Sequence, residues 1–181
     1  TMMVLEQAAR LSNDPAVRFA ALVHDLGKGT TPEEEWPKHI AHEARGVPLV
    51  KALSLRLKVP NDFRDLAVLV TRYHLHYHRA AELQNSTFLD TLQALDAFRR
   101  PERFEQWLLA CEADSRGRPG YEDQHFDQPA IFRKAFAAAA AIDGGELARQ
   151  GLQGEAIARE LAHLRLAAIK QARAPYIKDK A

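Results

Sequence analysis

The sequence predicts an all-α protein built as a helical bundle. Apolar residues recur at intervals of three and four along most of the 181 residues, and no segment alternates apolar and polar side chains with a period of two. N-cap residues and prolines precede several of these stretches, as they do at the starts of helices. No repeat and no low-complexity linker divides the chain, so we expect one compact domain with a sizeable core.

The first half of the chain predicts four helices. Apolar side chains at helical spacing cover residues 1–11. Asp14 is an N-cap followed by proline, so a second helix begins there and ends at Gly27. After an acidic loop, the same periodicity predicts a third helix over residues 41–57. Pro60 opens a fourth helix, which ends in a cluster of histidines.

The second half predicts four more helices. Ser86 caps a fifth helix that runs to Ala97, and Pro101 opens a sixth that reaches Asp114. A segment rich in Gly, Pro and Asp predicts a long loop over residues 115–129. The last two helices are expected over residues 130–142 and 154–174, joined by glycine-rich turns at 143–145 and 151–154. We divide the chain into a core over residues 1–120 and C-terminal helices over residues 121–181.

Composition excludes several classes of protein. Hydrophobic residues make up 46% of the chain, charged residues 27%, and the mean hydropathy is -0.35, as in ordinary soluble domains. No apolar stretch approaches the roughly 20 residues that cross a bilayer, so we expect no membrane partner and a cytoplasmic protein. The net charge of +1 gives no global attraction to nucleic acid. Because Thr1 already lies inside a predicted helix, we expect the chain to be part of a longer protein.

A metal site in this chain must use histidines and carboxylates, because the single Cys111 excludes a cysteine-rich zinc module and an internal disulfide. His24 and Asp25 are adjacent on one helix turn, where a neutral imidazole and a carboxylate suit Mn, Co, Ni, Mg or Zn. A single His-Asp pair also arises by chance, and a lone histidine here is more often a satisfied core residue. The pair therefore needs further ligands before it indicates a site.

Further candidates lie near the ends of other predicted helices. They are His39, His42, His74, His78 and Asp114. The histidines form pairs three or four residues apart, which places each pair on one helix face, and a bundle can gather helix ends into one pocket. Surface histidines give the same spacing, an alternative that stays open for His39 and His78, whereas His76 is expected to point away from its neighbours.

Several motifs follow one another in a characteristic order. They are Ala21–Lys28 around the His-Asp pair, His42–Gly46, a histidine in the next helix and Ala113-Asp114. Together they resemble the HD superfamily of metal-dependent phosphohydrolases. Four other segments are more narrowly similar to the C-terminal HD domain of bacterial CCA-adding tRNA nucleotidyltransferases: Trp36–His39, Val59–Asn61, Glu112–Arg118 and Gly151–Gly154 with Ile157. The resemblance covers nearly the whole chain and implies an HD-domain helical bundle, with the phosphohydrolase core in residues 1–120.

The resemblance also implies a ligand set for a divalent cation, Ni, Co, Mn or Mg. His24, Asp25 and Asp114 would be metal ligands, while His42 and His74 would complete a second metal site or bind phosphate. The family's first histidine has no match, and the pattern suggests a position at or just before Thr1. The Gly-Ser motif that the family uses for nucleotide addition is also absent, so this chain alone is not expected to synthesise CCA.

The chemistry expected of such a site is phosphoester hydrolysis. A cation held by imidazoles and carboxylates lowers the pKa of bound water and withdraws charge from a phosphate oxygen. We predict catalytic roles for His24, Asp25 and Lys28, and contacts from Lys28, Arg116 and Arg118 to the substrate phosphate. The alternative for these three basic residues is a solvated surface position. By resemblance, the substrates would be 2′,3′-cyclic phosphates, 2′-nucleotides and small phosphomonoesters, including damaged tRNA ends.

The C-terminal region could contact tRNA. Its basic residues are Arg159, Arg165, Lys170 and Arg173 on the last helix and the tail over residues 176–180. Such charges are more often a solvated face, although the loop at 151–154 could offer backbone donors to an RNA phosphate. A competing hypothesis is therefore an all-α tRNA-binding or dimerisation module with an inactive HD site. The apolar run over residues 135–142 would permit a homodimer.

Overall fold

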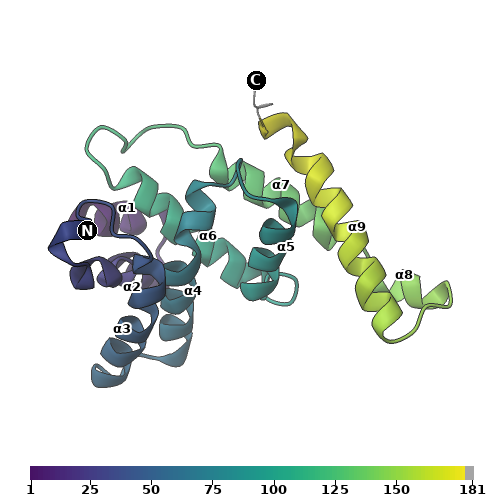
Figure 1. The fold of residues 1–181 in the computed structure, drawn as a ribbon, viewed down its shortest axis with the longest axis horizontal. Coiled ribbons are helices and arrows are strands. Elements are labelled where there is room, and N and C mark those ends of the chain that lie inside the picture. Colours follow the sequence, from purple (N-terminus) through teal and green to yellow (C-terminus); the bar gives the residue numbers. More distant parts are fainter. Residues whose placement is uncertain (178–181) are drawn as a thin grey trace.

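The structure, a computed structural model, describes residues 1–177 and confirms the all-α prediction. No β-strand occurs within this range. The α-helices are α1 (Met2–Leu11), α2 (Pro15–Val23), α3 (His42–Arg56), α4 (Asn61–His78), α5 (Asn85–Ala94), α6 (Pro101–Arg116), α7 (Gln128–Ala140), α8 (Gly144–Arg149) and α9 (Glu155–Arg173). Short 3-10 helices are η1 (Leu26–Thr30), η2 (Glu33–Glu35) and η3 (Ala174–Tyr176). Figure 1 shows α1–α4 and α6 together at one end, and α8 and α9 at the other.

The predicted start of α2 is observed, and it also fixes the helix in the bundle. Asp14 accepts a hydrogen bond from the Ala16 amide at 2.8 Å, as an N-cap does. Its second carboxylate oxygen accepts from the Gln106 side chain on α6 at 2.6 Å. The same residue therefore begins α2 and ties that helix to α6.

Two local predictions in the second half are wrong. Helix α5 begins at Asn85, directly after Gln84, and Ser86 lies inside the first turn instead of capping it. The turn predicted at 143–145 is the start of the short helix α8, where Asp143 accepts from the Gly145 amide at 2.8 Å. Two glycines lower the helix propensity there, but the N-cap and the burial of Leu147 outweigh that cost.

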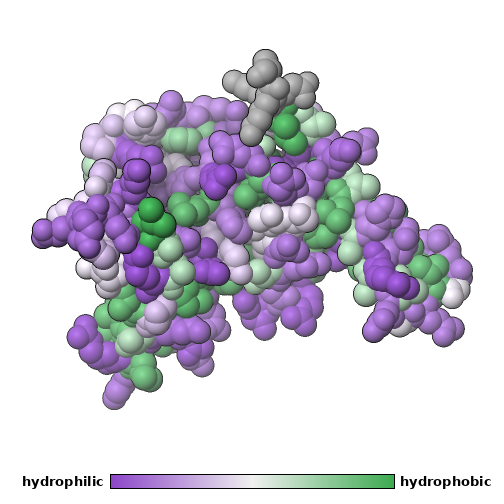
Figure 2. Space-filling view, viewed as in Figure 1, coloured by the Kyte–Doolittle hydropathy of each residue, from purple (hydrophilic) through white to green (hydrophobic). Residues whose placement is uncertain are grey.

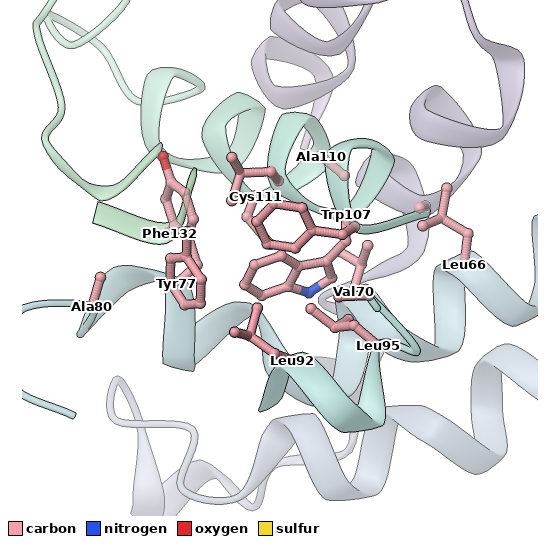
Figure 3. Packing of buried hydrophobic residues seen from close by; sticks show 14 of the residues in the cluster. Leu66, Val70, Tyr77, Ala80, Leu92, Leu95, Trp107, Ala110, Cys111 and Phe132 are labelled. Carbon is pink, nitrogen blue, oxygen red and sulfur yellow. The ribbon is translucent and has the colours of Figure 1, made fainter. Parts of the chain in front are cut away.

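The main core is centred on Trp107 of α6 (Figure 3). Its indole ring packs edge-on against Phe132 of α7, with ring centroids 5.1 Å apart, and against Tyr77 of α4 at 6.2 Å. All three side chains are fully buried. The cluster continues to Ile169 of α9, so buried residues from both sides of position 120 share one core. The boundary at residue 120 itself stays a prediction.

A second, smaller cluster brings three helices into close contact. Its members are Val4, Ala8, Ala21 and Ala113, from α1, α2 and α6. Small side chains permit a close approach of backbones, and this contact lies beside the end of α2 and the end of α6. The two helix ends that carry His24 and Asp114 are thereby held together.

The C-terminal helix differs from the sequence prediction. Arg173 is completely buried, where its guanidinium donates to groups of the α4–α5 connection, so its predicted contact with RNA is wrong. Arg165 lies 3.8 Å above the centre of the Phe98 ring, whereas Arg159 and Lys170 are exposed. Residues 178–180 of the predicted basic tail lie outside the described residues.

Part of the apolar run expected to permit dimerisation is used within the chain. Ala135 and Ala139 are fully buried in the core cluster, to which Ile169 of α9 also belongs and against which Leu166 packs, whereas Ala137, Ala140 and Ala141 are exposed. The face of the molecule in Figure 2 is mainly hydrophilic, with small separate hydrophobic areas. Among the described residues, no helix combines the length and apolar character that a membrane span requires.

Candidate metal centre

Four segments bring the predicted ligands to one place. His24 follows the last residue of α2, and Asp25 precedes η1. His42 is the first residue of α3, His74 lies in the last turns of α4, and Asp114 lies near the end of α6. The sequence spacing between these residues reaches 90 positions, so only the tertiary fold assembles them. His24, His42 and His74 are buried, and the side chain of Asp114 is 14% exposed.

The ligand atoms lie close together around Asp25. Its Oδ2 is 3.4 Å from His24 Nε2, and its Oδ1 is 3.3 Å from His42 Nε2 and 3.8 Å from His74 Nε2. Asp114 Oδ1 lies 3.3 Å from His24 Nε2 on another side. Ligand atoms of His24, Asp25 and His74 all lie within 4.8 Å of one another. Asp25 thus faces His24 with one oxygen and the other two histidines with its second.

Each of the three imidazoles is oriented by a backbone carbonyl. His24 Nδ1 donates to Ala21 O at 2.8 Å, His42 Nδ1 to His39 O at 2.9 Å, and His74 Nδ1 to Thr71 O at 3.0 Å. In a neutral ring this bond leaves the lone pair on Nε2, which points to the centre in all three cases. Metal-binding histidines are held in this way in proteins.

This arrangement fits a cation. His42 Nε2 and His74 Nε2 are only 3.0 Å apart, and two lone pairs at that distance repel unless a proton or a metal lies beside them. His24 Nε2 and Asp25 Oδ1 are buried and have no hydrogen-bond partner within residues 1–177. Buried polar atoms are normally satisfied, so these two atoms indicate a missing positive partner. The donor set of imidazole nitrogens and carboxylate oxygens suits a divalent transition metal or Mg.

The surrounding charges shift the pKa values of the ligands. Burial lowers the pKa of His24, but the carboxylates of Asp114 and Asp25 outweigh it and raise that pKa above its usual value. Burial and the nearby His24 lower the pKa of His74 to about 4. Burial opposes ionisation of Asp114, yet the nearby His24 ring and the hydrogen bond from His78 hold its pKa far below the usual range. The centre thus keeps its carboxylates ionised and His74 neutral at pH 7.

These shifts predict that the metal-free chain is most stable near pH 6.5. Because the pKa of His24 is raised, the folded state binds the His24 proton more tightly than the unfolded state does. This proton stabilises the fold below a pH of about 6.5, the usual histidine pKa, and the stabilisation is lost as the pH rises through the pKa of His24 in the folded state. The lowered pKa of His74 acts oppositely, and stability falls as the pH drops from about 6.5 toward 4. Urea unfolding with a chelator over this pH range measures the effect. Asp114→Asn should remove the alkaline decline, whereas substitution of the exposed His163 by glutamine should preserve it.

The loop before α3 is fixed by hydrogen bonds to Thr31. Arg45 donates to Thr31 Oγ1 at 2.9 Å and to Ile40 O at 2.6 Å, and the His39 ring bonds to the same hydroxyl at 3.0 Å. His39 and Ala41 have φ values of 47° and 57°, in the left-handed region that side chains disfavour. This strained turn sets the His39 carbonyl where it orients His42.

The three basic residues predicted to bind phosphate differ in their contacts. Lys28 donates to Asp25 Oδ2 at 2.5 Å, and its side chain is 42% exposed at the edge of the centre. Arg116 forms an ion pair with Glu112 at 2.8 Å and donates to Glu122 O, while Arg118 is exposed in the loop after α6. Only Lys28 is brought to the ligand cluster by a contact in the structure.

His78 is the residue that the sequence left undecided and the structure places at the centre. Its Nε2 donates to Asp114 Oδ2 at 2.6 Å, and Ser115 Oγ lies 3.3 Å from its Nδ1. The four-residue spacing from His74 was the available signal, but only the approach of α6 shows its partner. His39 bonds to Thr31 instead of the cluster, and His76 bonds to Thr91 on α5.

The sequence profile of the HD domain matches residues 1–111, which is more than half of the chain. The chain belongs to the HD-domain family. This finding confirms the family expected from the motifs around His24 and Asp25. α1 of this HD domain contains no histidine, and a first family histidine at or before Thr1 stays a prediction.

Curated relatives of this HD-domain chain carry the name Multifunctional CCA protein. The relative from Thioalkalivibrio sulfidiphilus is 54% identical over 97% of this chain and 43% of its own length. The relative from Nitrosococcus oceani is 56% identical over 95% of this chain and 42% of its own length, and that from Hahella chejuensis is 49% identical over 99% and 43%. The chain therefore spans less than half the length of these relatives. No solved structure matches it.

Proposed function

We propose that this chain is the metal-dependent phosphohydrolase domain of a CCA-adding enzyme. Its ligands for Ni, Co, Mn or Mg are His24, Asp25, His42, His74 and Asp114. The observation that carries the proposal is the set of three buried imidazole nitrogens directed at Asp25, of which His24 Nε2 has no hydrogen-bond partner in the described part of the chain. The names of the relatives and the HD-domain match support the same reaction class.

Several residues of the chain have separate roles in the proposed hydrolysis. A divalent metal held by these residues would supply an activated water and would withdraw charge from a phosphate oxygen. Asp25 holds Lys28 at the edge of the centre, where the ammonium group can neutralise a phosphate oxygen. The nearby His24 ring and the hydrogen bond from His78 keep Asp114 ionised, so it can serve as a ligand. Arg116 and Arg118 remain proposed phosphate contacts, and Arg116 would have to leave Glu112 to make one.

We further propose that the substrates are 2′,3′-cyclic phosphates, 2′-nucleotides and phosphomonoesters, and that they include tRNA 3′ ends in the cytoplasm. The relatives' name supports the link to CCA ends. The competing proposal is a tRNA-binding or dimerisation module with an inactive site. The burial of Arg173 removes one basic group from the surface on which that alternative depends.

Hydrolysis by Asp25→Asn tests the proposal. The chain is stripped of metal with a chelator, supplied with Ni, Co, Mn or Mg, and assayed on 2′,3′-cyclic AMP and on p-nitrophenyl phosphate. We expect the substitution to lower kcat/KM at least about a hundredfold, because it removes the carboxylate that faces all three histidines. Metal affinity, measured by calorimetry, should fall with it.

Asp90→Asn is the matched control, because Asp90 is an exposed aspartate on α5. It should leave hydrolysis and metal affinity unchanged. A chain that binds tRNA but hydrolyses neither substrate with any of the four metals would contradict the phosphohydrolase proposal and favour the binding module.

A further inference from the structure

A cleft of about 1550 Å³ lies beside the metal centre. Its walls come from the C-terminal half of α4, the start of α5, the loop over residues 117–127, the start of α7 and the end of the described chain at Tyr176 and Ile177. That loop leaves the end of α6 and returns to the bundle at α7 (Figure 1). A typical pocket for one small ligand measures about 300–1000 Å³, so this cleft is larger than one nucleotide needs.

The cleft borders the metal centre at His78. This residue lines the cleft, and the same ring donates to Asp114 at 2.6 Å. Its ring centroid lies 6.1 Å from that of His74. A molecule in the cleft whose end lies at His78 is thus one side chain away from the proposed ligand Asp114, while the rest of it extends away from the centre.

Aromatic rings from three separate segments line the cleft. They are Tyr73 on α4, Tyr121 and Phe126 in the loop over residues 117–127, and Tyr176 on η3. The Tyr121 side chain has no partner ring among the described residues, and the residue is 44% exposed. Flat aromatic side chains on the wall of a groove are the usual platforms on which the bases of a single strand stack.

The charges of the cleft are nearly balanced. Arg72 and Arg79 lie on its wall, and so do Glu43, Glu82 and Asp127. Arg72 has no ion pair within residues 1–177, and the pair between Arg79 and Glu82 is solvent-exposed. A strand held by its phosphates needs a strongly basic groove, which is not found here. The wall of the cleft therefore suits stacked bases, and Arg72 and Arg79 are available to contact a few phosphates.

We propose that this cleft binds the single-stranded 3′ segment of an RNA, with the bases stacked on its aromatic wall and the terminal phosphoester at the metal centre. The inference rests on the proposed function and narrows its substrate class. The preferred substrate is then the end of an oligonucleotide, and a mononucleotide occupies only the part of the site next to His78.

Binding to the metal-free chain tests the cleft separately from the chemistry. The probe is a fluorescein-labelled octaadenylate ending in a 2′,3′-cyclic phosphate, followed by fluorescence anisotropy with a chelator present and competed with 2′,3′-cyclic AMP. We expect the octamer to bind at least about tenfold more tightly than the mononucleotide, and Tyr121→Ala to weaken octamer binding about tenfold. Tyr121→Phe keeps the ring and should keep the affinity. Leu55→Ala, which removes a side chain 82% exposed at the end of α3, is the control and should change nothing.

Salt dependence and turnover complete the test. Two phosphate contacts on a single strand predict a log–log slope of about -1.4 for affinity against salt. With metal restored, Tyr121→Ala should lower kcat/KM for the octamer about tenfold more than for 2′,3′-cyclic AMP.

Equal affinity for octamer and mononucleotide, or an octamer affinity that Tyr121→Ala leaves intact, would overturn the inference even if the chain hydrolyses mononucleotides. Octamer binding that depends on Tyr121, in a chain without hydrolysis, would support the cleft and refute the phosphohydrolase.

Discussion

Gly27→Ala is expected to lower the free energy of unfolding by at least about 3 kcal/mol and to abolish metal binding. A β-carbon at this position would lie 1.9 Å from the carbonyl oxygen of His42 and 2.7 Å from the amide nitrogen of Gly46. Both atoms belong to the backbone of α3, so no side-chain rotation can relieve the overlap. The helix η1 must then separate from α3.

The effect on the metal centre follows from what these two elements carry. Asp25 directly precedes η1 and His42 begins α3, and their ligand atoms are 3.3 Å apart. Any displacement that accommodates the new methyl group moves one ligand away from the other. Urea unfolding measures the loss of stability, and titration of the metal-free chain with Co(II) measures the loss of affinity.

Gly29→Ala is the matched control in the same 3-10 helix. No atom of the described residues lies within 4 Å of the position that its β-carbon would occupy, and its φ is not in the left-handed region. We expect this variant to unfold within about 0.5 kcal/mol of the unaltered chain and to bind Co(II) normally. Similar behaviour of the two variants would show that the close approach of η1 to α3 does not position the centre.

Helical periodicity and helix signals predicted most of the fold. The Asp14-Pro15 start of α2 and the Pro101 start of α6 are both observed, because their capping chemistry depends on neighbouring residues alone. α8 was missed because its two initial glycines resemble a turn, and the burial of Leu147 that favours the helix comes from tertiary packing.

The candidate site was predictable as a set of residue types, but its geometry was not. Spacing and helix ends singled out His24, His42, His74 and Asp114, all of which the fold brings together. His78 stayed undecided because its partner lies 36 positions away, on a helix whose approach no local pattern encodes. The ion pair of Glu112 with Arg116, in contrast, joins residues four apart on α6, a spacing that helical periodicity does indicate.

Arg173 is the residue for which the prediction from the sequence differs most from the structure. A charged side chain at the end of an amphipathic helix is normally solvated, yet this guanidinium donates to Ala80 O at 2.7 Å, to Leu83 O at 2.8 Å and to Asn85 Oδ1. It also lies 4.5 Å above the centre of the Phe88 ring. It thus satisfies the backbone carbonyls of Ala80 and Leu83 in the α4–α5 connection.

Arg173→Ala is therefore expected to lower the free energy of unfolding by about 3 kcal/mol, because it leaves these acceptors unpaired and opens a gap beside Phe88. Hydrogen exchange should show the loss concentrated in α9 and in the α4–α5 connection, and urea unfolding gives its size. Lys170→Ala, one turn earlier on the exposed face of the same helix, should change stability by less than about 0.5 kcal/mol. If the two variants unfold alike, Arg173 does not anchor α9.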